Sequence, residues 1–220
     1  MAERSWLALF LTLALGGALA DQVSKYAVFH RLYAASRPVT LDGARQGERV
    51  VLPGVFELLA QFTPDRETGT GPRARLRTLG GNALPAVNHG ALFGFLRHHE
   101  SLANGLFAAI SLIAACAITW WAGRPSVRHD RGLVFALGLI LAGTLGNLFD
   151  RLVFDGVRDF LHWHYHDAFD WPVFNLADCF LVVGALLLLA QAFLAKSHAA
   201  QPAATLADSP PVPEEIAQPG

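Results

Sequence analysis

Acidic and amide side chains in the second half of the chain recur at a spacing that could support catalysis. "GNLFDR" places Asn147 three residues before Asp150, and "FNLAD" places Asn175 three residues before Asp178. Residues three apart lie on one face of a helix, so each amide can act on the same side as its acid. Asp159 of "VRDF" lies between the two pairs. These residues predict a cluster of carboxylates and amides, if the fold brings their segments together.

Two carboxylates held close together can carry out general acid–base chemistry. They cannot both ionise cheaply, so one pKa rises and the pair holds a shared proton. One member can then take a proton from water while the other hydrogen-bonds the carbonyl of the bond to be broken. This is peptide hydrolysis by an aspartic dyad, and because it needs neither metal nor cysteine, we expect no cofactor.

Each acid also has a structural explanation. Asp150 could form an interfacial ion pair with Arg151, and Asp159 could be solvated in a loop. Asp178 is harder to explain, because it lies in "VFNLADCFLVVGALLLLAQAF" (173–193), which is apolar enough to cross a membrane. An ionised Asp near the centre of such a helix costs roughly 2.5–3.5 kcal/mol on insertion scales, which makes Asp178 a functional candidate.

Composition indicates that the chain is a membrane protein. Its residues are 53% hydrophobic and 16% charged, whereas soluble domains are about a quarter charged. The net charge of −1 excludes a broadly basic nucleic-acid binder. Apolar runs of the length that a bilayer requires predict an all-α membrane protein, a bundle of four transmembrane helices within residues 1–196. The runs are 6–20, continuing as a helix to 28, then 102–122, 132–149 and 173–195.

The first apolar run has two interpretations. "MAERSWLALFLTLALGGALAD" begins with the basic Arg4, continues with a short apolar run and ends in small residues at 18–20. This pattern is typical of a cleaved secretory signal. On the pattern alone, a cleaved signal and a retained membrane anchor both stay open.

Charge between the apolar runs predicts their orientation. The short connection 123–131 contains arginines, and the positive-inside rule places it in the cytoplasm. Both termini would then be cytoplasmic, and the segments 28–100 and 151–172 would lie outside. The acid-bearing ends of the third and fourth helices would meet near the outer leaflet. The arginines are Arg124, Arg128 and Arg131.

The outer segment 28–100 is predicted to form a small extracytoplasmic β-region between the first two helices. Residues 49–62 favour one or two strands around Pro53 and Gly54. Residues 64–82 are polar and rich in Gly and Arg, so we expect a solvated loop insertion. Residues 84–96 are strand-like and could rest on the membrane surface. At the other end of the chain, the Ala/Pro-rich tail 197–220 is expected to be disordered.

Three histidines in "HWHYHD" raise the question of a metal site. His162, His164 and His166 would lie on one side of an extended strand, and histidine is a common zinc ligand. No carboxylate or cysteine at ligand spacing completes a site, and Cys116 and Cys179 lie in apolar runs as small hydrophobic residues. We therefore expect no metal.

The motifs, taken in order, resemble those of the lipoprotein signal peptidase family, signal peptidase II. "DQVSK", "NHGALFGFL", "GNLFDR", "VRDF" and "FNLAD" follow one another within residues 6–195 in the family's order and spacing. The resemblance implies an intramembrane aspartic endopeptidase of the bacterial cytoplasmic (inner) membrane. Its substrates would be diacylglyceryl-modified prolipoproteins, cut before the lipidated cysteine among membrane lipid. It also implies that the first segment is a retained membrane anchor. A four-helix bundle with one site can act as a monomer, so we expect a monomer.

The same resemblance assigns roles to individual residues. Asp159 and Asp178 would be the catalytic dyad. Asp21 and Lys25 of "DQVSK" would form a supporting polar pair at the end of the first helix. Other residues would bind substrate or support the dyad, namely Asn88, Asn147, Asp150, Arg151 and Asn175.

Two features depart from the family pattern. Extra residues, about 63–86, separate the strand around Glu57 from Asn88, and His89 and Leu92 stand where the family commonly has smaller residues. Both concern the cradle that would hold the substrate, so we expect them to alter substrate preference more than chemistry.

Two other functions compete with the peptidase. A proton-coupled transporter would spread its acids through the depth of the bundle, whereas this sequence clusters them at one end. A non-catalytic scaffold or lipoprotein-binding relative would not require both members of the dyad.

Overall fold

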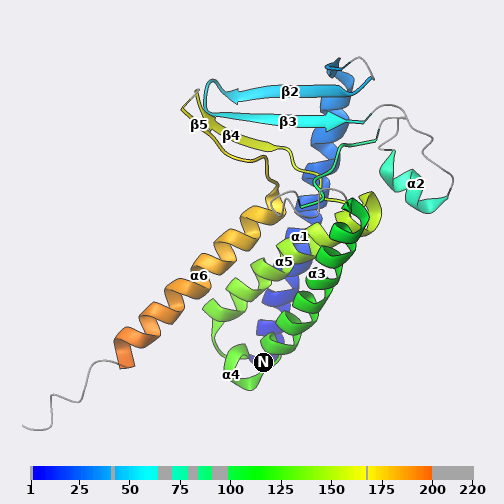
Figure 1. Cartoon of the computed structure of the whole chain (residues 1–220). Coiled ribbons are helices and arrows are strands. Elements are labelled where there is room, and N and C mark those ends of the chain that lie inside the picture. The colour runs from blue at the N-terminus through cyan, green and yellow to red at the C-terminus, as the bar shows by residue number, and fades with distance from the viewer. Residues whose placement is uncertain are drawn as a thin grey trace, which may run out of the picture.

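The chain folds into a bundle of long helices that carries a small sheet at one end (Figure 1). The computed structural model describes residues 2–40, 43–63, 71–78, 84–90, 99–166 and 168–199. Within them, four helices are long and apolar enough to cross a membrane, which confirms the predicted fold class. They are α1 (Ala2–Ala34), α3 (Glu100–Ala122), α5 (Arg131–Phe154) and α6 (Leu176–Ala199).

Helix α5 is the centre of the bundle and packs against α1, α3 and α6. Its buried residues Val134, Leu137 and Leu141 pack with Phe10 of α1. A small residue, Gly143, lets α6 approach closely. A Cβ atom added there would lie 2.3 Å from the backbone oxygen of Ala177. This contact brings the first turn of α6, which contains Asp178, against the part of α5 that contains Asn147 and Asp150.

Within the described residues, five short strands form an antiparallel sheet in chain order. The predicted strands around Pro53 and Gly54 are present as a hairpin, and Gly54 has a φ of 71° in its turn. The last two strands come from the segment between α5 and α6. The strands are β1 (Arg37–Pro38), β2 (Arg45–Leu52), β3 (Phe56–Phe62), β4 (Leu161–Tyr165) and β5 (Phe169–Asp170).

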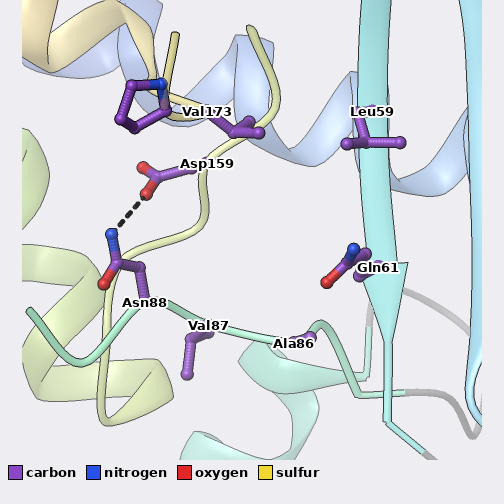
Figure 2. A pocket seen from close by; sticks show the side chains of 8 residues that line it. Leu59, Gln61, Ala86, Val87, Asn88, Asp159 and Val173 are labelled. Carbon is purple, nitrogen blue, oxygen red and sulfur yellow. Dashed lines mark hydrogen bonds between the residues drawn. The ribbon is translucent and has the colours of Figure 1, made fainter. Parts of the chain in front are cut away.

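The two faces of β3 have different functions because successive side chains alternate between them. Ala60 and Phe62 are buried with Phe29 of α1, so this face fixes the sheet on the first helix. Leu59 and Gln61 point to the opposite face, where they line a pocket (Figure 2).

The insertion contains a helix, α2 (Pro72–Arg77), so the prediction of an entirely irregular loop over 64–82 is wrong at these residues. Pro72 is well suited to the first turn of a helix. Arg73 and Arg77 both form ion pairs with Asp155 and both donate to the backbone oxygen of Val153 at the end of α5. Residues 64–70 and 79–83, like Leu92, lie outside the described residues.

The N-terminus and the short helix α4 (Pro125–Arg128) lie at the end of the bundle opposite the sheet (Figure 1). The arginine-containing connection and the acid-bearing helix ends are therefore on opposite sides, as the predicted topology requires. The assignment of these sides to cytoplasm and exterior stays a prediction. Helix α6 continues to Ala199, slightly past the expected boundary, and the rest of the tail lies outside the described residues.

Candidate active site

Asp159 and Asp178 are brought to the same amide, Asn175. Asp159 lies in the segment between α5 and β4, and its Oδ1 accepts from Asn175 Nδ2 at 2.7 Å. Asp178 lies in the first turn of α6, and its Oδ2 accepts from the backbone N–H of Asn175 at 3.1 Å. The fold therefore places the two predicted dyad residues around one asparagine.

The local structure of "FNLAD" orients the side chain of Asp178. The backbone N–H of Asp178 donates to Asn175 Oδ1 at 3.1 Å, while the Asp178 carboxylate accepts from the Asn175 backbone. This reciprocal pattern is a capping box at the start of α6. The i,i+3 spacing thus marks a helix start here, and it leaves Oδ1 of Asp178 available to a third residue.

That third residue is Asn147 of α5. Its Nδ2 donates to Asp178 Oδ1 at 2.8 Å. Its Oδ1 accepts from Asn175 Nδ2 at 3.2 Å and from Lys25 Nζ at 3.3 Å. Its hydrogen bonds therefore define the orientation of the Asn147 amide, which connects Asp178 and Asn175 to the buried charge of Lys25.

Those charges form a buried network beneath the site. Asp21, Lys25, Asp150 and Arg158 all have side chains with no solvent exposure. Lys25 Nζ lies 2.9 Å from Asp21 and 3.2 Å from Asp150, and Arg158 lies 2.7 Å from Asp150. The two negative charges and the two positive charges of this network cancel, and buried charges are stable only when they are paired in this way. Gln22 also joins the network, since its Oε1 accepts from Arg158 at 2.7 Å.

Arg158 and Gln22 are the residues of this site that the sequence analysis missed. Arg158 immediately precedes Asp159 in "VRDF", and a basic partner was to be expected for a buried Asp150. The proposed ion pair of Asp150 with Arg151 is wrong, because Asp150 faces Lys25 and Arg158. Arg151 instead places its guanidinium 5.3 Å from the ring centroid of Phe107 on α3.

A pocket of about 300 Å³ opens beside Asp159. Figure 2 shows Asp159 facing Asn88, whose Nδ2 donates to Asp159 Oδ2 at 3.0 Å, with Leu59 and Gln61 on the strand across from them. Asn88 is held by two backbone hydrogen bonds with Val157. The lining residues are Leu59, Gln61, Ala86, Val87, Asn88, Asp159, Pro172 and Val173.

The environment of Asp159 favours its protonated form. Burial raises its pKa from 3.8 to about 6, and the neighbouring Asp178 adds to this rise. The amides of Asn175 and Asn88 act in the opposite direction because they donate to the ionised carboxylate. A carboxyl group with this pKa can supply a proton near neutral pH.

Known proteins resemble the chain in both sequence and structure. The family model described as Signal peptidase (SPase) II matches residues 82–194. A lipoprotein signal peptidase of Rhodopirellula baltica is 44% identical over 120 residues, covering 49% of this chain and 52% of that protein. Another, of Ectopseudomonas mendocina, is 38% identical over 118 residues, covering 54% of this chain and 69% of that protein. The chain thus spans about half to two thirds of the length of these relatives.

A solved structure shares the fold. It is a bacterial membrane enzyme determined by the in meso method at 2.3 Å resolution, with a TM-score of 0.59 and 20% sequence identity. The alignment covers 89% of this chain and 93% of that one. Because the family model matches over half of the residues, the chain belongs to the signal peptidase II family.

Proposed function

We propose that the chain is an intramembrane aspartic endopeptidase that removes signal peptides from diacylglyceryl-modified prolipoproteins. The observation that carries the proposal is the meeting of Asp159 and Asp178 at Asn175, beside a pocket. Two carboxyl groups in such an arrangement can divide the roles of acid and base between them. The names of the relatives support the choice of lipoprotein precursors as substrates.

The two acids receive different roles in this proposal. Asp159 holds the proton, in keeping with its raised pKa. Asp178 takes a proton from a water molecule, whose oxygen attacks the carbonyl carbon of the scissile peptide bond. Asp159 gives its proton to the carbonyl oxygen, so a neutral tetrahedral intermediate forms. Its collapse breaks the C–N bond. The proton on Asp178 passes to the leaving nitrogen, and one hydroxyl of the intermediate returns a proton to Asp159 as the new carboxyl group forms.

The position of the site suits a substrate embedded in the membrane. Asp178 lies in the first turn of a helix long and apolar enough to cross a membrane, and the pocket is lined by residues of β3 and by Pro172 and Val173, just before that helix. A signal helix and its lipid chains could stay in the bilayer while the peptide bond reaches the pocket. We place the site near the outer leaflet of the bacterial inner membrane, with both termini cytoplasmic, and expect a monomer to suffice.

A proton-coupled transporter is less compatible with the geometry. Such a protein would need titratable groups along the depth of the bundle. The buried acids Asp21 and Asp150 lie instead beside the dyad, joined to it through Lys25 and Asn147.

The test is cleavage of a diacylglyceryl-modified prolipoprotein by the purified full chain in detergent, with a chelator present. Asp159→Asn and Asp178→Asn should each reduce kcat by at least about 10³-fold, because each removes one proton-transfer group. Asp130→Asn is the matched control. Asp130 caps α5 at the far end of the bundle, where its side chain accepts from Leu133 N, and asparagine preserves this cap.

Substantial activity in either dyad variant would refute the assignment of the two acids. Equal cleavage of a precursor without the diacylglyceryl group would refute the proposed substrate class while leaving the dyad intact.

A further inference from the structure

A row of side chains of the types that can bind a metal ion crosses the sheet, away from Asp159 and Asp178. Glu57 of β3 pairs in register with His162 of β4, and His164 pairs with Asp170 of β5. Directly paired residues of antiparallel strands point to the same face. One potential ligand atom from each of Glu57, His162 and His164 lies within 4.8 Å of the others. The expectation of no metal rested on a missing carboxylate, and β3 supplies one.

The contacts of His162 indicate that something belongs between these groups. Its Nδ1 lies 2.8 Å from Glu57 Oε1, and its Nε2 lies 2.7 Å from Asp170 Oδ1. A neutral imidazole has a single N–H, so it can donate to only one of these carboxylates. Either the ring carries a second proton, or a cation takes the place of that proton.

The position of His164 favours the cation. Its ring is stacked on that of His162, with centroids 5.1 Å apart. The two carboxylates already accept both N–H groups of a doubly protonated His162, so the second imidazole would add no hydrogen bond to it. A metal ion would gain a nitrogen ligand from His164. Ligand atoms on a tetrahedral zinc ion are about 3.3 Å apart for bonds of about 2.0–2.1 Å. The separations within the row, 2.8 Å between His162 and Glu57 and at most 4.8 Å to His164, span this value.

We propose that Glu57, His162 and His164 bind a divalent transition-metal ion, with zinc the best match. Two imidazoles and one carboxylate form a ligand set that zinc accepts, with a fourth position open to water. Asp170 would be the outer carboxylate that holds the Nε2–H of His162, so that Nδ1 faces the metal. Metal-bound histidines are commonly oriented in this way.

The metal would join β3 to β4. Glu57 lies on the same face of β3 as Leu59 and Gln61, which line the pocket. His162 follows Asp159 by three residues. A metal ion at this position would therefore fix one wall of the pocket relative to the segment that carries Asp159. It takes no part in the proposed hydrolysis.

Zinc binding to the tag-free full chain in detergent tests the proposal without reference to activity. After removal of metal by a chelator, calorimetric titration should show one zinc ion per chain with a Kd in the micromolar range or below, and Co²⁺ should give the visible absorption of a tetrahedral site. His164→Ala and Glu57→Gln should each weaken binding at least about 100-fold. Asp170→Asn should weaken it about 10–100-fold, as loss of an outer partner does.

The matched control is His166→Asn, on the same hairpin but outside the ligand set. His166 has a φ of 45°, which asparagine tolerates, so this variant should bind zinc as the wild type does. Absence of binding by the wild type up to about 1 mM zinc would overturn the proposal and leave His162 as a protonated bridge between carboxylates. Equal binding by wild type, His164→Ala and Glu57→Gln would overturn it too.

A second measurement does not depend on the variants folding. Zinc that binds only the folded state raises the temperature of unfolding, and excess chelator reverses the rise. The wild type should show this reversible shift. A wild type whose unfolding temperature is the same with zinc and with chelator contradicts the site.

Discussion

Arg158 and Asp150 are joined by three hydrogen bonds, although neither side chain is exposed to solvent. The backbone N–H of Arg158 donates to Asp150 Oδ2 at 2.9 Å, its Nε donates to the same oxygen at 3.2 Å, and its Nη2 donates to Oδ1 at 2.7 Å. These bonds fold the segment after α5 back onto α5 itself. Asp159 is the next residue, so this pair determines where the proposed acid lies.

Arg158→Met should destabilise the protein strongly. It removes one partner of a buried ion pair, which costs about 3–5 kcal/mol when the remaining charge stays buried. Lys25 would then be the one remaining salt-bridge partner of Asp150 among the described residues. The measurements are thermal unfolding in detergent and, well below the unfolding temperature, the kcat of cleavage, which should fall because Asp159 loses its support.

Arg124→Met is the control for that substitution. Arg124 is exposed at the opposite end of the bundle, 4.3 Å from the ring centroid of Trp120. Its loss should change stability by about 1 kcal/mol or less. An Arg158→Met protein as stable and as active as the wild type would show that the pair does not position the dyad.

Asn175→Ala should lower kcat by about 10²-fold, a typical effect of losing one preorganised hydrogen-bond donor. It should also cost about 1 kcal/mol of stability, because Asn175 caps α6. Asn175→Ser separates the two effects, since serine keeps a cap acceptor but lacks the amide that donates to Asp159. We expect Asn175→Ser to be as inactive as Asn175→Ala yet more stable.

Asn104→Ala provides the matched comparison for Asn175. Asn104 is a buried asparagine on α3 whose Nδ2 donates to the backbone oxygen of Arg151 at 3.1 Å. Its loss should reduce stability and leave kcat close to the wild-type value. If both alanine variants lose activity equally, Asn175 acts only through stability.

The sequence predicted those features that depend on local pattern. The four membrane-spanning helices follow from apolar runs of bilayer length, and the hairpin follows from Pro53 and Gly54 between two strand-like runs. "FNLAD" also has a local meaning, because Asn175 and Asp178 meet at a helix start. The similar pair Asn147 and Asp150 lies inside a continuous helix, where the two side chains do not cap a helix start but both reach Lys25 of α1. Equal spacing therefore did not mean equal structure.

Contacts between distant segments could not be predicted in this way. Gln22 and Arg158 meet across 136 residues, and Glu57 and His162 across 105. The first contact depends on how α1 packs on α5, and the second on the register of β3 against β4. Neither leaves a periodic signal in one sequence. The helix α2 is short, and Arg73 and Arg77 attach it to the end of α5. In the sequence, these arginines cannot be told from ordinary solvated charges.

The pKa of Asp159 predicts how stability depends on pH. Its value is about 6 in the folded state against 3.8 for an ordinary aspartate, so the folded state binds the proton more tightly. The free energy of unfolding should therefore fall as pH rises from 4 to 6, by up to about 3 kcal/mol. Asp159→Asn has no such ionisation, and at pH 8 it should be more stable than the wild type by a similar amount.

Thermal unfolding in detergent between pH 4 and 8 tests this, with Asp130→Asn as a control that should keep the wild-type profile. A stability difference between wild type and Asp159→Asn that is the same at all pH values contradicts the raised pKa. In the wild type, kcat/KM should also fall about tenfold per pH unit above pH 6, as the proton on Asp159 is lost.

The insertion should affect which substrates are cut. Helix α2 contacts Asp155, the first residue after α5, which adopts a left-handed conformation with a φ of 64°. The backbone oxygen of Asp155 also lies 2.8 Å from His89 Nδ1, next to the pocket residue Asn88. Arg73 and Arg77 thus attach the insertion to Asp155, which in turn contacts the segment that carries Asn88.

Replacing both Arg73 and Arg77 by glutamine should have little effect on stability, because partly exposed ion pairs contribute about 0.2–1 kcal/mol each. The pocket walls should shift instead. The ratio of kcat/KM between two lipidated precursors should therefore change by up to about fivefold per lost ion pair. The kcat for the precursor that is cleaved more efficiently should stay within about twofold of the wild-type value. Arg75→Gln is the control, since Arg75 lies on the same helix and its side chain has no partner among the described residues. Complete loss of cleavage by a folded double variant would instead make the insertion part of the catalytic machinery, with α2 required to hold Asp159 in place.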